Sequence, residues 1–260
     1  MAMVKASASA VNYSRTGSKR IHNPNEVVRR ARQRYKSVTA LQVTRKASAR
    51  LTKNMGLKYV DVYLVDGPIH PASTSQAAKG MAECVSLGLT KTVGVANYSL
   101  DDMIQMSDEL AKFGIPLATN QCEFSVLRRW PELHGLIKAC RDRGIIFQSY
   151  SSLAQARLTG KYTPENPPPN NYRFGSYDMR DLVPTQDVLK EIALERGVSQ
   201  ASVAINYNLL KGATPTVGIR DPKHAEDLVG ALGWRLTLRE VERIDAVSME
   251  GKTTVLWQHG

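Results

Sequence analysis

The sequence has few cysteines and no long apolar run. Its three cysteines, Cys84, Cys122 and Cys140, lie far apart and show neither CxxC nor CxxH spacing. This spacing argues against a disulfide framework and a zinc ribbon, and it favours a reducing compartment in which each cysteine is a small buried hydrophobe. No stretch approaches the roughly 18 unbroken apolar residues that a membrane-spanning helix needs, which excludes a transmembrane protein.

Acidic residues are almost absent from the first part of the chain. Residues 1–55 contain thirteen Lys or Arg and one acid, Glu26, a charge of +12, whereas residues 56–260 carry 22 basic and 23 acidic residues. The net charge of +11 therefore belongs to an N-terminal arm, and the rest of the chain is close to neutral. With 42% hydrophobic residues among 260, the chain can bury a substantial core.

We expect residues 1–37 to be a basic, disordered arm. Residues 1–25 are rich in Ser, Ala, Lys and Arg and have no apolar segment, so a secretory signal is excluded. We therefore expect a cytoplasmic protein, but the same composition is typical of a mitochondrial transit peptide, which stays an alternative. Binding of nucleic acid by the arm is a weaker alternative, because the arm lacks the interleaved aromatic side chains of a stacking platform.

From about residue 38 the chain alternates between helix-like and strand-like segments. Strands are expected at Tyr59–Val65, Thr92–Ala96, Leu117–Gln121, Ile145–Tyr150 and Thr214–Ile219. Helices are expected at 39–55, 75–87, 100–113, 131–143, 185–196, 200–210, 223–232 and 237–247. Four prolines and two glycines between residues 155 and 182 predict a long loop there, and a long loop inside a compact domain is usually functional.

Strands separated by helices imply a parallel sheet with right-handed crossovers. A dinucleotide-binding doubly wound sheet requires GxGxxG after its first strand, and this motif is absent. We therefore predict an α/β fold of the other kind, an incomplete (β/α)8 TIM barrel that retains about five C-terminal strand–helix units within residues 38–260.

Polar or aromatic residues follow each of the five expected strands. In a parallel barrel these strand ends meet on one face, where the active site lies. The residues concerned are Asp66, Asn97, Asn120 with Gln121, Tyr150 with Ser151, and Arg220. Each has a structural alternative when taken singly: Asp66 could form a turn before Gly-Pro, Asn97 could cap a helix, and Gln121 could bond a loop.

The chemistry of these side chains fits a nicotinamide dinucleotide. Asn97 and Gln121 each offer a donor and an acceptor in fixed geometry, which suits a carboxamide. The Tyr150 ring could stack on a flat heterocycle, and Arg220 opens the last strand–helix loop, where a phosphate could be held. Two lysines that could add to the phosphate site are Lys161 and Lys223.

Several ordered motifs resemble those of the aldo-keto reductase family. The resemblance covers roughly residues 45–250, and its motifs are Leu57–Val65, Gly94–Ser99, Asn120–Ser125, Tyr150–Lys161 and Val217–Arg220. It implies a (β/α)8 barrel, a usual cofactor of NADP(H), and hydride transfer between the nicotinamide and a carbonyl or alcohol without a metal.

The resemblance also implies roles for single residues. Asn97 and Gln121 look like the carboxamide ligands, and Tyr150 looks like the ring that stacks on the nicotinamide. The loop from Ser151 to Lys161 looks like the one that holds the pyrophosphate, and its residues of interest are Ser151, Ser152, Leu153, Ala154, Gln155, Gly160 and Lys161. Arg220 and Lys223 look like part of the grip on the 2′-phosphate.

The departures from the family concern catalysis. The family's catalytic set is a Tyr acid with a Lys, an Asp and a His; Tyr, Asp and Lys come from the first three strands, which we expect to have no counterpart here. The His position, after the strand Tyr59–Val65, is Asp66. A positioned acid contributes about 10²- to 10⁴-fold to rate, and an ionised aspartate is a poor one. The sequence thus predicts a cofactor site without a recognisable acid.

Two classes of function follow. The first is an NADP-dependent oxidoreductase that acts on a small-molecule carbonyl compound, with a loose likeness to reductases of secondary metabolism around Gly67–Pro71 and Gly233–Trp234. The second is a catalytically inactive or degenerate barrel that binds a dinucleotide or a partner, since a missing half-barrel would leave strand edges unpaired.

Overall fold

The computed structural model describes residues 3–7, 57–68, 72–169, 177–219, 222–253 and 260. These residues fall into two compact units. The first comprises Met1–Gln121, Asp142–Ile145 and Thr253–Gly260, and the second comprises Cys122–Arg141 and Ile146–Lys252. The expected helix 39–55 and most of the basic arm lie outside the described residues.

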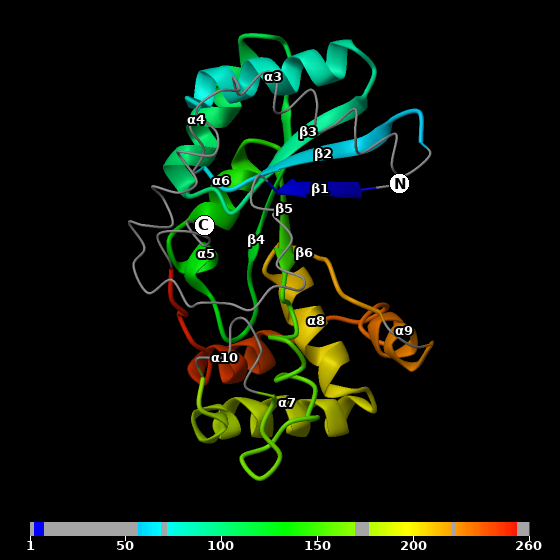
Figure 1. The fold of residues 1–260 in the computed structure, drawn as a ribbon. Helices are drawn as coiled ribbons and strands as arrows, with labels where there is room; N and C mark the ends of the chain where they lie inside the picture. The colour runs from blue at the N-terminus through cyan, green and yellow to red at the C-terminus, as the bar shows by residue number, and fades with distance from the viewer. Residues whose placement is uncertain (1–2, 8–56, 69–71, 170–176, 220–221, 254–259) are drawn as a thin grey trace. The chain divides into compact units, whose positions relative to one another are not determined.

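The first unit is built on parallel strands with two helices. Its strands are β1 (Met3–Ser7), β2 (Val60–Asp66), β3 (Thr90–Ala96) and β4 (Leu117–Glu123), the last of which ends in the second unit. Its helices are α3 (Thr74–Ser86) and α4 (Leu100–Ala111). The strands pair in sequence order, β1 with β2, β2 with β3 and β3 with β4, all parallel. Figure 1 shows α3 and α4 lying together beside β3.

Local sequence signals explain where the helices of the first unit begin. At the start of α3 the Ser73 hydroxyl accepts from the Gln76 backbone N–H, and the Gln76 side-chain oxygen accepts from the Ser73 backbone N–H. These two hydrogen bonds form a capping box. Ser99 caps α4, and Asp101 and Asp102 lie in its first turn as expected. Each cap satisfies backbone groups that a helix end leaves open, so both helices start at fixed positions beside the strand ends.

The core of the first unit contains apolar side chains from both strands and helices. Its fully buried members include Val60, Leu64, Ala78, Met81, Cys84, Val93, Val95, Met103, Met106 and Leu110. Gly94 is required where β3 passes its neighbours, since a Cβ there would lie 2.5 Å from the Leu64 side chain and 2.8 Å from the Thr119 carbonyl oxygen. The register between β3 and β4 shifts at the same place, between Val93 and Val95.

The second unit contains most of the helices. Its elements are α5 (Trp130–Leu133), α6 (Leu136–Asp142, whose last residue belongs to the first unit), β5 (Ile146–Tyr150), η1 (Met179–Leu182), α7 (Val183–Arg196), α8 (Gln200–Leu210), β6 (Thr214–Pro215), α9 (Pro222–Val229) and α10 (Leu238–Ala246). β5 pairs with β6 in parallel. In its core the Phe124 ring meets the Phe147 ring edge to face at a centroid distance of 6.0 Å and stacks on the Tyr207 ring at 6.5 Å.

The five strands expected from the sequence are all present, but one of them is shorter than expected and two other segments also differ from the expectation. The expected helix 131–143 is two helices, because Gly135 adopts a left-handed φ of 78° between them. The last strand is shorter than expected and ends at Pro215. β1 was not expected at all, and it lies within the segment interpreted as a disordered arm.

Candidate functional site

The polar residues at the ends of β2, β3 and β4 lie together in the first unit. Asn97 Nδ2 donates to Asp66 Oδ1 at 2.8 Å, and the Asn97 backbone N–H donates to the Gln121 carbonyl oxygen at 2.9 Å. Asp66 is half-buried, whereas Asn97 and Gln121 are only 4% and 8% exposed. The structure therefore brings together three of the residues that the sequence singled out, from three neighbouring strands.

The backbone at Asn97 turns sharply after β3. Its φ of 62° is left-handed, a conformation that Asn tolerates better than most residues because its short amide bonds locally. The Gly67 N–H donates to the Ala96 carbonyl oxygen at 2.7 Å, which ties the end of β2 to the same turn. Two residues later Ser99 caps α4, so Asn97 is fixed between a strand end and a helix start.

Asn120, next to Gln121, has a structural contact. Its Nδ2 donates to the Tyr98 carbonyl oxygen at 3.0 Å, and its side chain is fully buried. Tyr98 is also buried, and burial raises the pKa of its hydroxyl, with the charges of Asp102 and Asp66 adding to the effect. Asn120 thus supports the turn that carries Asn97, and Gln121 is the better candidate for a ligand contact.

In the second unit, Tyr150 ends β5 and begins the predicted pyrophosphate loop. Its carbonyl oxygen accepts from the Phe124 N–H at 3.3 Å, and the residue is half-buried. Ser152, which is buried, donates through its hydroxyl to the Ser149 carbonyl oxygen at 3.1 Å. The Thr216 N–H donates to that same oxygen at 2.7 Å. The start of the loop is therefore held between β5 and β6.

The loop after Tyr150 has an unusual backbone. Five of its residues have positive φ, namely Ser151 (54°), Ala154 (46°), Gln155 (55°), Ala156 (70°) and Gly160 (77°). Four of them are not glycine, and left-handed conformations cost such residues roughly 1–2 kcal/mol each. Strained backbone of this kind persists only where the surroundings hold it, and it gathers at ligand sites.

Neighbouring groups hold this strained loop in place. The Arg157 guanidinium donates to the Ala154 carbonyl oxygen at 3.3 Å and to Gln155 Oε1 at 3.4 Å. Gln186 Nε2, on α7, donates to the Arg157 carbonyl oxygen at 2.8 Å. Gly160 has a left-handed φ of 77°, and a Cβ there would lie 2.0 Å from the Gln200 side-chain oxygen, so a larger residue would be strained and would displace that side chain. Leu153 is half-buried, and Lys161 is exposed near the Tyr162 ring.

The predicted 2′-phosphate ligands cannot be placed in the same way. Arg220 lies outside the described residues. Lys223 lies on α9, but its side chain is outside the described part of the structure. The assignment of these two residues to a phosphate stays a prediction.

A pocket in the second unit was not anticipated from the sequence. It is lined by Glu123, Ser125, Leu127, Arg128, Ala154, Gln155, Arg157 and Tyr177. Burial raises the pKa of Glu123 and lowers that of Arg128, and the opposite charge of each partly offsets the effect on the other. Ala154 and Gln155 connect this pocket with the predicted pyrophosphate loop. Glu123 and Ser125 were part of a motif, but no sequence signal marked Arg128 or Tyr177.

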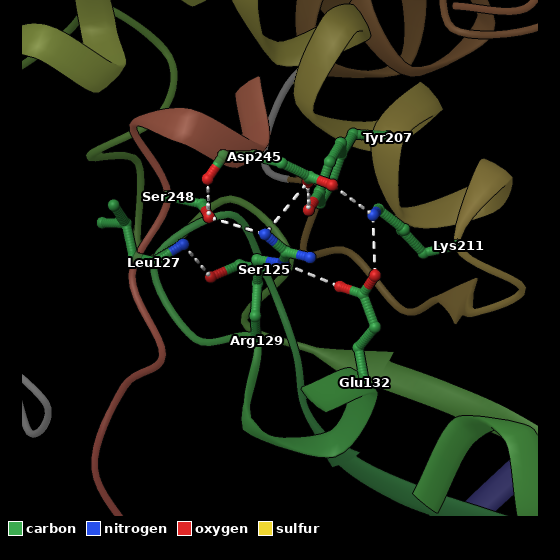
Figure 2. Close-up of polar contacts among 8 residues, drawn as sticks. All are labelled: Ser125, Leu127, Arg129, Glu132, Tyr207, Lys211, Asp245 and Ser248. Carbon is green, nitrogen blue, oxygen red and sulfur yellow. Dashed lines mark hydrogen bonds and ion pairs between the residues drawn. The ribbon is translucent and has the colours of Figure 1, made fainter. Parts of the chain in front are cut away.

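Figure 2 shows a polar cluster of the second unit that contains a Tyr, a Lys and an Asp. Tyr207 Oη donates to Asp245 Oδ1 at 2.6 Å, and Lys211 Nζ donates to Asp245 Oδ2 at 2.8 Å and to Glu132 Oε1 at 2.6 Å. Arg129 completes the cluster with Glu132 and Asp245, at 2.7 and 3.2 Å.

This cluster joins helices and is a poor candidate for catalysis. Tyr207 is fully buried, and burial together with the hydrogen bond to Asp245 raises the pKa of its hydroxyl. A catalytic acid must reach the proton acceptor of a substrate, which a fully buried hydroxyl does not. The two positive and two negative charges balance, and the cluster connects α5, α8 and α10.

β1 corrects the expectation that no strand precedes β2. Lys5 of β1 pairs in register with Leu64 of β2, and Ser7 pairs with Asp66. A lysine therefore lies on the strand next to Asp66, near the end where the candidate residues gather. No sequence pattern predicted this strand, because Met3–Ser7 is short and lies within the basic arm.

Comparison with known proteins identifies the class to which the fold and the site belong. The model of the aldo/keto reductase family matches residues 32–249 of this chain. That match covers more than half of the chain, so the chain belongs to the aldo/keto reductase family.

Relatives named as reductases give the same result. Pyridoxal reductase of Arabidopsis thaliana is 35% identical over 179 residues, which is 68% of this chain and 49% of that protein. L-glyceraldehyde 3-phosphate reductase of Escherichia coli is 29% identical over 219 residues, which is 79% of this chain and 63% of that protein. The chain thus spans about half to two thirds of the length of these relatives.

Solved structures confirm the fold. A glycerol dehydrogenase from Gluconobacter oxydans matches with a TM-score of 0.71 and 20% identity, over 84% of this chain and 67% of that one. An aldo-keto reductase from Bombyx mori, solved with NADP, matches with a TM-score of 0.63 and 20% identity, over 82% and 65%. The fold is therefore an incomplete (β/α)8 barrel, as predicted. None of the helices in the described residues has the length and apolar character needed to cross a membrane.

Proposed function

We propose that this chain is an NADP-dependent oxidoreductase that transfers a hydride between NADP(H) and a small carbonyl or alcohol. The observation that carries the proposal is the placement of the Asn97 and Gln121 amides at neighbouring strand ends, tied by a 2.9 Å backbone hydrogen bond. Family membership supports it. So does the name of a yeast relative, an NADPH-dependent alpha-keto amide reductase that is 25% identical over 203 residues.

The residues of the first unit fit the carboxamide of a nicotinamide. The hydrogen bond from Asn97 Nδ2 to Asp66 fixes the orientation of the Asn97 amide. Its Oδ1 atom therefore points away from the Asp66 carboxylate. Gln121, from the next strand, offers a second amide. When bound, the cofactor would supply or accept the hydride. The protein's part is to hold the carboxamide at Asn97 and Gln121 and the pyrophosphate along residues 151–161.

The substrate is proposed as a small carbonyl compound. The relatives named above act, by their names, on pyridoxal and on glyceraldehyde 3-phosphate. Two plant relatives carry names of aldo-keto reductases for complex natural products, which supports a place in secondary metabolism. We also propose a cytoplasmic location, which is supported by the small number of cysteines and by their wide spacing, without CxxC or CxxH pairs.

Titration with NADPH tests the proposal. We expect saturable quenching of protein fluorescence at micromolar NADPH, and about a tenfold weaker affinity in Gln121→Leu, which keeps the size of the side chain and removes its amide. Gln105→Leu, on the exposed face of α4, is the matched control and should bind like the wild type. Absence of binding, or equal affinity in Gln121→Leu, would contradict the proposal.

A barrel that binds the dinucleotide without turnover is a second candidate. It is favoured by Asp66 at the family's His position and by the burial of two of the tyrosines described in the first unit. Tyr63 and Tyr98 are 3% and 1% exposed, and burial raises the pKa of both hydroxyls. NADPH consumption with a panel of aldehydes and ketones separates the two candidates. Turnover of any carbonyl rejects the inactive barrel.

A further inference from the structure

Asp66 places a carboxylate directly behind the amide that is proposed to hold the nicotinamide. Its Oδ1 accepts from Asn97 Nδ2 at 2.8 Å, and Asp66 pairs in register with Ala96, the residue before Asn97. The Gly67 N–H donates to the Ala96 carbonyl oxygen at 2.7 Å, so the backbone on both sides is fixed. The position of this charge is therefore set by two strands.

We infer that Asp66 tunes the cofactor site toward the oxidised nucleotide. This inference rests on the proposed function. The nicotinamide ring carries a positive charge in NADP⁺ and none in NADPH, and the carboxamide is bonded directly to that ring. A carboxylate one amide away stabilises the charged ring and leaves the neutral ring almost unaffected. The chain then binds NADP⁺ more tightly, relative to NADPH, than it would with a neutral side chain at position 66.

The surroundings of Asp66 determine the size of the effect. The side chain is half-buried, so its field is screened less than that of a fully exposed charge. Its charge is also felt at the buried Tyr98 hydroxyl, whose pKa it helps to raise. For charges separated by one bridging amide, Coulomb's law with protein-like screening gives roughly a 3- to 30-fold change in relative affinity.

Asp66 also has a second role, because its carboxylate fixes the orientation of the Asn97 side-chain amide. Because Asn97 donates to Asp66 through its nitrogen, the opposite orientation of the amide would bring its oxygen against the carboxylate. Asp66 thereby fixes how the amide meets the carboxamide. Removing the charge and removing the hydrogen bond are consequently separable, because an asparagine at position 66 can still accept from Asn97 through its own oxygen.

Four proteins test the inference by measured dissociation constants for NADP⁺ and NADPH: the wild type, Asp66→Asn, Asp66→Ala and Asp101→Asn. Calorimetry or fluorescence gives both constants without any turnover. We expect Asp66→Asn to lower the preference for NADP⁺ over NADPH by roughly 3- to 30-fold, with little change in the NADPH constant. Asp66→Ala should weaken the binding of both nucleotides, because it also removes the hydrogen bond that orients Asn97. Asp101→Asn, which removes an exposed carboxylate at the start of α4, should match the wild type.

The outcomes separate this inference from the proposed function. If the wild type binds both nucleotides and Asp66→Asn leaves their ratio unchanged, the inference is wrong and the proposed function stands. If the wild type binds neither nucleotide, both are wrong. A ratio that shifts equally in Asp101→Asn would assign the effect to net charge and would also overturn the inference.

Discussion

At the scale of single residues, the most unusual feature is the run of left-handed residues in the predicted pyrophosphate loop. Ala154, Gln155 and Ala156 have φ of 46°, 55° and 70°, although none of them is glycine. A Cβ in this conformation crowds the following carbonyl oxygen. The loop therefore carries conformational energy that its anchors, Arg157 and Gln186, have to offset.

Glycine at the two alanines should stabilise the chain. We expect Ala154→Gly and Ala156→Gly each to raise the free energy of unfolding by about 0.5–1 kcal/mol, because relief of the left-handed strain exceeds the added freedom of the unfolded chain. Urea unfolding measures the change. Ala193→Gly, inside α7, is the control and should lower stability by about 1 kcal/mol or more. A loss of stability in the loop variants would contradict the prediction, because it would show that replacing these alanines relieves no backbone strain.

Single residues at the strand ends were predictable because strand ends in parallel sheets gather on one side. Asp66, Asn97 and Gln121 could be named on that ground before any contact was known. The bond between Asp66 and Asn97 could not, because it depends on the register of β2 and β3 and on the left-handed turn at Asn97. The charged pocket around Arg128 was missed because its lining comes from three separate segments.

At the scale of elements, an ion pair connects the end of α7 with the start of α10. Arg196 donates to Glu240 through Nε at 2.8 Å and Nη2 at 2.6 Å, and the Thr237 N–H donates to the same carboxylate at 2.6 Å. Glu240 is thus both the third residue of a capping box and a partner of Arg196. These contacts lower the pKa of Glu240 to about 2, and the hydrogen bonds from Arg196 make the largest contribution.

The lowered pKa predicts a pH dependence of stability. A carboxyl group whose pKa falls on folding stabilises the native state above its unfolded pKa of 4.5, and this contribution is lost as the pH falls toward 2. Glu240→Gln should cost about 1 kcal/mol near neutral pH and progressively less below pH 4.5. Urea unfolding over this range measures the difference. Glu242→Gln, at an exposed position of α10, is the control, and an equal effect of both variants would contradict the prediction.

The elements found by sequence patterns are those with a strong local signal. β2 and β3 are rich in β-branched residues and each begins shortly after a glycine, and α4 begins at a capping serine followed, after Leu100, by two acids. Two strands are exceptions. β1 has the short sequence MVKAS, and it is a strand because it pairs with β2. β6 contains only Thr214 and Pro215, although the Thr216 N–H still donates to the Ser149 carbonyl oxygen.

At the scale of the whole molecule, charge and chain length are the defining features. Residues 1–55 hold a charge of +12, while the remainder is close to neutral. The family match starts at residue 32, so it includes part of this basic segment. We therefore expect any attraction of the protein to polyanions to come mainly from residues 1–55, because the rest of the chain has almost no net charge.

This asymmetry predicts how the protein behaves on a polyanion column. Replacing Arg29, Arg30, Arg32 and Arg34 by Gln should move elution from heparin to markedly lower salt, because these charges are close together and act jointly. The control replaces four exposed basic residues of the later chain, namely Lys58, Lys79, Lys190 and Arg239. Equal shifts for both variants would show that total charge alone decides retention.

The burial of the three cysteines determines when their thiols can react. Cys84 is enclosed in the first unit and Cys122 and Cys140 in the second, and none of the three is exposed. Burial also raises the pKa of the Cys140 thiol to about 12, so its reactive thiolate is scarce in the native state. An alkylating or oxidising reagent can attack these atoms only when the surrounding unit opens. The rate at which these thiols react is thus set by how often each unit opens, and mass spectrometry of labelled peptides could report that frequency for each unit separately.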